Sequence, residues 1–289
     1  ESAERVKLFD ASAAILLASG HAPGSLLKMP ALADSMREVA SGGRDAFYRG
    51  ELAGRIARGS QEGGGLLAEE DLAGYEAEWL DPVSIDYRGY QVFTPPPNSG
   101  GFQILQTLKL MEGFDPSETT FHNPETTHLL IEAIKLSSTD RVTHSGDSGQ
   151  VKVPLEKLLS SEYAAAQRGR ISRDSAAVLS GVRYRPEARG GAIGAGTQWE
   201  SVNGETTHFV VADRLGNVVS VTQTLGAFFG SGAAVGDTGI FMNDGCEWFD
   251  EVGGPNPIGP GKKVGFVLAP TQTLLDGHFY MSIGTTGGY

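Results

Sequence analysis

The sequence contains only one cysteine, Cys246, in 289 residues. A single thiol cannot form an internal disulfide, so the fold cannot rest on a disulfide framework. No apolar run reaches the length of about 20 residues that a membrane-spanning helix needs, and no signal peptide is visible. These absences leave the compartment open, since a periplasmic or extracellular location and a cytoplasmic one both fit the sequence.

Positive charge is also scarce. Lys and Arg total 23 against 35 Asp and Glu, which gives a net charge of −12. Nucleic-acid binding needs clustered positive charge to neutralise phosphates, so no nucleic-acid partner is expected. The 40 glycines follow no Gly-X-Y triplet, which excludes a collagen-like chain. What remains is the composition of an ordinary soluble globular protein, with 40% hydrophobic and 20% charged residues.

The first part of the chain is predicted to be mainly helical. Asp45 is expected to cap a helix that ends near residue 58. Further helices are expected at about 102–110 and 125–139, where apolar residues recur at helical spacing. Between these helices, residues 83–94 are rich in β-branched and aromatic residues and are predicted to form strands.

After about residue 205 the chain becomes rich in strands. Residues 207–212 and 218–224 are predicted to form a hairpin with its turn at 213–217. Two more strands are expected at 266–269 and 278–283, joined through a turn. Helices followed by hairpins favour an α+β fold in which helices are layered on antiparallel sheet, rather than alternating βαβ units.

The boundary between these parts is the stretch from about 168 to 204. It contains six arginines and a glycine-rich run, and it loses the periodicity of its neighbours. Such a composition is typical of an exposed, mobile segment. We therefore expect two regions, residues 1–205 and residues 206–289, that together form one domain.

The junction at Thr206 carries the chemistry. A hydroxyl at the point where a mobile segment meets a strand can attack the carbonyl of the preceding residue, Glu205, and hydrolysis then releases a new N-terminus. The freed α-amine, with a pKa of about 7.7–8.0, can serve as the base for its own threonine hydroxyl. Taken alone, two threonines at a strand start indicate no more than β-propensity.

A series of motifs in the same order along the chain favours the catalytic interpretation of Thr206 over simple β-propensity. The run from Thr206 to Thr222 reads Thr-Thr-His, a strand, Asp-x-x-Gly-Asn and Val-Val-Ser-Val-Thr. This run resembles the start of the small subunit of the gamma-glutamyltranspeptidases, a family of N-terminal-nucleophile hydrolases, and the resemblance extends over most of the chain. The other matching motifs are DAFYRG at 45–50, GGL at 64–66, EDLAGY at 70–75, YRGY at 87–90, PPPNSGG at 95–101, EAIKL at 132–136, DR at 140–141, VKVP at 151–154 and GTTGG at 284–288.

The resemblance implies an αββα sandwich, with two antiparallel sheets between helical layers. It implies that Thr206 is the nucleophile, both for self-cleavage after Glu205 and for attack on the substrate, and that Thr224 hydrogen-bonds to it. The backbone N–H groups of Gly287 and Gly288 are expected to form the oxyanion hole. The implied partners are a small-molecule amide donor and a water or amine acceptor, with large and small subunits cut from one precursor. No cofactor and no metal are expected.

The sequence departs from the family where the glutamyl group is held. The family's asparagine two residues beyond the supporting threonine is Gly226 here. The Gln and second Asp that bind the α-amino group become Gly245 and Trp248, and the two serines that hold the α-carboxylate become Phe266 and Val267. A zwitterionic amino-acid head needs polar partners, so we expect a more apolar acyl pocket.

Three interpretations stay open. The Glu247 carboxylate can still bind the α-amino group of a substrate, which keeps a gamma-glutamyl substrate possible. An apolar pocket favours an acylase or amidase that acts on another acyl group. The third interpretation is an unprocessed, non-catalytic homologue, against which the retention of Thr206, Thr224 and the glycine pair argues. Beside these candidates, His208 is expected to be structural and Cys246 to be inert or to line the pocket.

Overall fold

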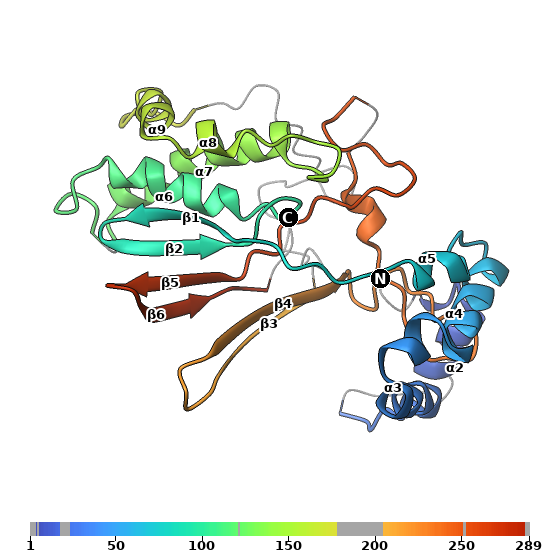
Figure 1. Cartoon of the computed structure of the whole chain (residues 1–289). Coiled ribbons are helices and arrows are strands. Elements are labelled where there is room, and N and C mark those ends of the chain that lie inside the picture. Colours follow the sequence, from blue (N-terminus) through green and yellow to red (C-terminus); the bar gives the residue numbers. More distant parts are fainter. Residues whose placement is uncertain are drawn as a thin grey trace.

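The computed structural model describes residue 4 and residues 6–17, 24–120, 122–177, 205–250 and 253–286. Its elements combine helices with antiparallel strands, as the sequence predicts for an α+β fold (Figure 1). In chain order they are α2 (Asp10–Leu16), α3 (Pro30–Tyr48), α4 (Glu51–Glu62), α5 (Glu69–Ala73), β1 (Val83–Tyr87), β2 (Tyr90–Thr94), α6 (Phe102–Glu112), α7 (Pro124–His144), α8 (Leu155–Leu158), α9 (Ser161–Arg168), β3 (Glu205–Ala212), β4 (Val218–Gly226), the 3-10 turn η2 (Gly245–Trp248), β5 (Thr271–Leu275) and β6 (His278–Ile283).

A four-stranded antiparallel sheet joins the two parts of the chain. Its strand order is β1-β2-β5-β6, so a hairpin from the first part lies beside a hairpin from the second. The central pairing sets Val92 of β2 opposite Thr273 of β5. Because each part supplies only half of this sheet, the two parts must fold together to complete it.

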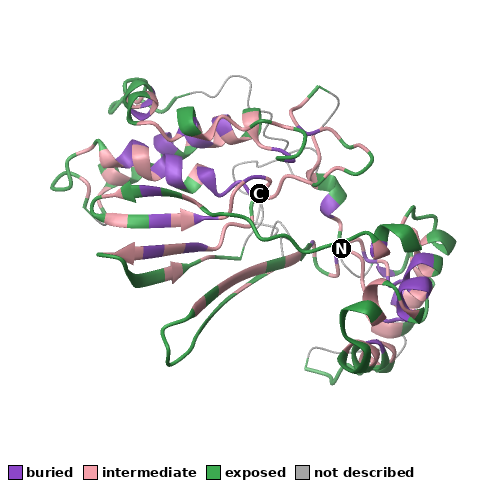
Figure 2. Ribbon diagram, in the orientation of Figure 1, coloured by how far each residue is buried: buried purple, intermediate pink, exposed green. Residues whose placement is uncertain are grey.

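Helix α6 lies on one face of this sheet, and α7 and α9 pack against α6 on the same side of it (Figure 1). Leu105 of α6 is fully buried against Ile85 of β1 and Val92 of β2, and Figure 2 shows buried residues concentrated along α6 and α7. Truncating such a leucine to alanine costs about 2–5 kcal/mol. Asn123 caps α7 by accepting the N–H of Glu125. In the described part of the chain, no helix is both long and apolar enough to cross a membrane.

The N-terminal helices α3, α4 and α5 form a second group, which packs on the loop that follows β4 (Figure 1). Leu52 and Ile56 of α4 share a buried cluster with Val235 of that loop. The Ser35 hydroxyl of α3 donates to the Thr238 carbonyl at 2.8 Å. These contacts fix the loop that leads away from the end of the β3–β4 hairpin.

The predicted cap at Asp45 is wrong. Helix α3 continues through Asp45 to Tyr48, although its backbone leaves helical geometry at Gly43. The Asp45 carbonyl accepts the N–H of Arg49, and α4 begins only after Gly50. Asp45 thus falls in the first turn after the kink, where a carboxylate still interacts favourably with the helix dipole.

The predicted strand at 266–269 is also wrong. Phe266 makes one isolated parallel bridge to Ser99, and the strand that pairs with β6 is β5, which starts at Thr271. Pro270 separates the two segments and lacks the N–H that a continuous ladder would use. The predicted strands at 83–94, 207–212, 218–224 and 278–283 are confirmed to within two residues.

The segment expected to be mobile has defined contacts at its start. Arg168 donates to the carbonyl of Lys109 at 2.9 Å, and the Glu132 carboxylate of α7 accepts the N–H of Ala177 at 3.1 Å. Residues 168–177 are therefore held against α6 and α7. The remainder of the predicted segment, residues 178–204, lies outside the described residues.

Candidate active site

The two threonines singled out by the sequence lie opposite each other on β3 and β4. Thr206 and Thr224 are Cα partners in this antiparallel pair, and both are partly buried. Cross-strand partners project to the same face, with Cβ atoms about 4.5–5.5 Å apart. The structure therefore brings the candidate nucleophile and its candidate supporting threonine together.

The strand pairing is irregular at the bond where cleavage is expected. The register shifts between Glu205 and Thr206, and Gly226 is the partner of Glu205. The Thr224 hydroxyl accepts the N–H of Gly226 at 2.9 Å. A bulge in a strand changes the direction of the neighbouring backbone, so the peptide before Thr206 does not follow the regular ladder.

Asp244 occupies the space beside Gly226. A Cβ at position 226 would overlap the Asp244 carboxylate, and the glycine has a φ of +96°. The N–H of Ala227 donates to both carboxylate oxygens, at 3.1 and 3.2 Å. The sequence alone allows two roles for Asp244, one in a turn and one in contact with the substrate. The structure places its carboxylate beside Gly226, the last residue of β4.

The turn η2 carries two of the predicted pocket residues. The Asn243 side chain accepts the N–H of Gly245 at 2.9 Å, which fixes the start of the turn. A Cβ on Gly245 would stand 3.9 Å from the ring of Trp248, which is partly buried. Glu247 is exposed, as is the neighbouring Cys246. Trp248 therefore offers a partly buried apolar surface at this turn, while Glu247 faces solvent.

Phe266 and Val267 lie in a segment held by the loop between β2 and α6. The Phe266 N–H donates to the carbonyl of Asn98 at 3.1 Å. The buried Ser99 hydroxyl donates to the carbonyl of Leu268 at 2.8 Å. The Pro-Pro-Pro-Asn-Ser-Gly-Gly motif thus fixes the backbone of the candidate acyl pocket, a role that the sequence pattern does not reveal.

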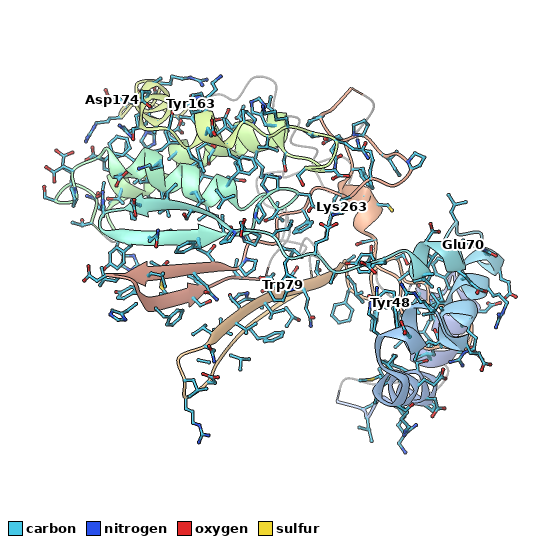
Figure 3. The ribbon with its side chains drawn as sticks, in the orientation of Figure 1. Tyr48, Glu70, Trp79, Tyr163, Asp174 and Lys263 are labelled. Carbon is cyan, nitrogen blue, oxygen red and sulfur yellow. The ribbon has the colours of Figure 1, made fainter. Side chains whose placement is uncertain are left out.

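The chain just before Phe266 is anchored by Asp147, in the loop after α7. The buried Asp147 carboxylate accepts the N–H of Lys263 at 3.0 Å and that of Gly149 at 2.9 Å. Donation from the Lys263 N–H holds the pKa of Asp147 below its usual range. The side chain of Lys263, labelled in Figure 3, pairs with Glu78 at 2.6 Å. Residues of the first part of the chain therefore hold this segment of the second part.

The predicted oxyanion donors, Gly287 and Gly288, lie outside the described residues, as does the side chain of Glu205. Their predicted roles remain predictions. The described part of the site consists of Thr206 and Thr224 on the hairpin, with the backbone of Gly226 and the Asp244 carboxylate beside them.

A sequence profile of the gamma-glutamyltranspeptidase family matches residues 2–289. The glutathione hydrolase proenzyme of Escherichia coli (strain K12) is 36% identical over 277 residues, which cover 92% of this chain and 46% of that protein. The acylase ACY 1 proenzyme of Pseudomonas sp. (strain SE83) is 34% identical over 287 residues, which cover 95% of this chain and 47% of that protein.

Among solved structures, the crystal structure of cephalosporin acylase from Bacillus halodurans matches with a TM-score of 0.80 at 30% identity. The match covers 97% of this chain and 50% of that chain. The chain spans about half the length of the curated relatives it matches. The profile covers the helical part, the shared sheet and the hairpin that carries Thr206, and the chain belongs to the gamma-glutamyltranspeptidase family.

Proposed function

We propose that this chain carries the self-cleaving, amide-attacking part of a gamma-glutamyltranspeptidase-like amidohydrolase and acyltransferase. The observation that supports this most is the position of Thr206, at the start of β3 and opposite Thr224, in a chain that matches the family from residue 2 to residue 289. Two relatives are named proenzymes, which fits a precursor cut into two subunits. Residues 1–205 then belong to the large subunit and residues 206–289 to the small one.

Self-cleavage begins at the irregular peptide before Thr206. The Thr206 Oγ attacks the carbonyl carbon of Glu205, the peptide C–N bond breaks, and the acyl group moves from nitrogen to oxygen. Water then hydrolyses this ester, which leaves a carboxylate on Glu205 and a free α-amine on Thr206. The register shift between these two residues supports the assignment, because it sets this peptide apart from the regular ladder.

Attack on a substrate uses the same hydroxyl. The α-amine of Thr206 takes the hydroxyl proton and then gives it to the departing amine, while the acyl group stays on the oxygen as an ester. Water or an acceptor amine resolves that ester. Gly287 and Gly288 donate N–H groups to the tetrahedral oxyanion, and a single donor of this kind contributes about 2.7–4 kcal/mol. The Thr224 hydroxyl is oriented by the N–H of Gly226 and supports Thr206.

A second candidate function, an acylase for a non-glutamyl acyl group, is favoured by the pocket residues. Phe266, Val267 and Trp248 offer apolar surface at positions where the family binds the charged groups of glutamate. Leaving such charges unpaired costs about 1–3 kcal/mol or more for each group. Relatives named acylase ACY 1 and cephalosporin acylase match this chain about as closely as those named glutathione hydrolase.

We also propose the four-layer αββα arrangement for the complete fold. The four-stranded sheet with α6 on its face and α7 packed against α6, together with the separate β3–β4 hairpin, is consistent with it. Exposed apolar residues on the outward faces of β3, β4 and β6 support further layers, since such surfaces are ordinarily covered. They include Phe209, Val211, Val219, Phe279 and Ile283.

Two measurements test this function. Denaturing electrophoresis with intact-mass analysis asks whether the purified protein divides between Glu205 and Thr206. Turnover of gamma-glutamyl anilide is then compared with turnover of butyryl anilide, an acyl group of similar reach that lacks both charged groups of glutamate. Preference for the gamma-glutamyl donor supports the first candidate, and preference for the butyryl donor supports the acylase. A chain that stays whole and turns over neither donor contradicts both.

A further inference from the structure

His208 shares the face of the β3–β4 hairpin that carries Thr206. The two residues are separated by one position on β3, and side chains two apart along a strand project to the same side. The cross-strand partner of His208 is Thr222, just as Thr224 is the partner of Thr206. His208 Nδ1 and Thr222 Oγ1 are 2.8 Å apart. Two polar pairs therefore stand side by side on this face.

The imidazole ring also joins the hairpin to the other sheet. It lies against Gly284, the first residue after β6, and a Cβ there would overlap the ring atoms Nδ1 and Cε1. Gly284 therefore has no room for a side chain while the ring is in place. A second link joins the same two sheets, since the Gln272 side chain of β5 donates to the Val218 carbonyl of β4 at 3.3 Å.

The remaining ring nitrogen, Nε2, is buried and has no hydrogen-bond partner in the described part of the chain. Burying a polar atom without a partner is unfavourable, and native proteins keep few such atoms. The packing against Gly284 agrees with the structural role expected for His208. This packing does not explain why the side chain next to the candidate nucleophile is an imidazole, whose Nε2 has no hydrogen-bond partner in the described part of the chain.

We propose that His208 is a positioning residue for acyl transfer. Its ring, fixed in rotation by Thr222, sets the spacing between the strand that bears Thr206 and the segment Gly284–Thr286. This inference rests on the proposed function, in which that segment leads directly to the oxyanion donors in the sequence. A displacement of about 1 Å between the nucleophile and the groups that stabilise its adduct can lower a rate by about 100-fold.

The first test compares His208→Ala and His208→Asn with the unsubstituted protein in single-turnover acylation. Positioning acts on the transition state, so the acylation rate constant, and with it the steady-state kcat measured in parallel, should fall at least about tenfold for His208→Ala while KM changes little. Asparagine keeps a hydrogen-bonding group near the place of Nδ1 and should restore part of the rate. Thr222→Val removes only the hydrogen bond, so its kcat should fall between those of His208→Ala and the unsubstituted protein. His278→Ala, at an exposed histidine of β6, is the matched control and should have no effect.

The second test is a double-mutant cycle between His208 and Gly284. Gly284→Ala should lower kcat in the unsubstituted background, because the methyl group displaces the ring. In the His208→Ala background the same change should have little further effect. Equal effects of Gly284→Ala in both backgrounds would overturn the proposal.

The outcomes separate this inference from the function on which it rests. If the unsubstituted protein forms no acyl adduct on Thr206, the proposed function fails. If it forms the adduct and His208→Ala forms it at the same rate, only the positioning role fails. Should His208→Ala fold poorly, Thr222→Val decides, and an unchanged kcat in that variant contradicts the proposal.

Discussion

The Asp244 carboxylate fills the space that a side chain on Gly226 would occupy. Gly226 is buried and has a φ of +96°, a conformation that residues with a Cβ rarely adopt. The carboxylate is itself held by the N–H of Ala227. The residue types at positions 226 and 244 are therefore coupled. In this arrangement an asparagine at 226, as in the family pattern, would overlap the Asp244 carboxylate.

Gly226→Ala should accordingly destabilise the fold by about 1–3 kcal/mol, through backbone strain and overlap with the carboxylate. In the Asp244→Ala background the overlap is relieved and the same change should cost less. Midpoints of chemical denaturation for the four proteins measure the difference. An equal cost in both backgrounds would show that the carboxylate does not fill this space.

Removing the Ser99 hydroxyl should disturb the acyl pocket from a distance. Ser99→Ala leaves the Leu268 carbonyl without its donor, at a cost of about 1–3 kcal/mol. Because the same loop holds the backbone of Phe266, KM for the acyl donor should rise as well. Ser41→Ala is the control, since Ser41 also donates to a backbone carbonyl but is exposed. If both variants keep the stability and KM of the unsubstituted protein, the loop does not position the pocket.

Asp147 should make the stability of the protein depend on acid pH. Its native pKa is lowered, mainly by the N–H of Lys263, from about 3.9 in an unfolded chain. The ionised carboxylate therefore stabilises the native state above about pH 4, and this contribution is lost as pH falls through the native pKa. Asp147→Asn should be less stable near neutral pH, and its deficit should shrink below about pH 4. Denaturation curves at a series of pH values measure this, and a deficit that does not change with pH contradicts it.

Restoring hydroxyl groups in the pocket should shift substrate preference. Phe266→Ser combined with Val267→Ser returns two polar groups to the positions that hold an α-carboxylate in the family pattern. The ratio of kcat/KM for gamma-glutamyl anilide to that for γ-aminobutyryl anilide, which lacks only the α-carboxylate, should rise about tenfold. An unchanged ratio would mean that these two positions do not contact the acyl group.

Much of the strand pattern could be predicted from the sequence because it is local. The hairpins at 83–94 and 205–226 combine β-branched residues with clear turn signals, and both form as expected. Residues 266–269 carry the same kind of apolar composition, yet they bond to the distant loop at Asn98 and Ser99 instead of forming a strand. No local pattern distinguishes a segment held by a loop about 170 residues away from one held by a hairpin partner.

The candidate site also combines features that local motifs predict with contacts that they do not. Thr206 and Thr224 could be identified from motif order, and strand pairing brings them opposite each other. The Asp244 carboxylate beside Gly226 and the His208 ring against Gly284 are contacts between segments distant in sequence. Such contacts depend on three-dimensional packing, and a single sequence gives no measure of it.

The most direct test of the account is the mass of the peptide that begins at residue 206. After incubation with an acyl-anilide donor and rapid acid quench, the processed protein should yield a small subunit whose N-terminal residue is Thr206 and which carries the mass of one acyl group on that residue. Thr206→Ala should remain a single chain without the added mass. Catalytic turnover by a protein still continuous between Glu205 and Thr206, or an acyl group found on another residue, would contradict the account.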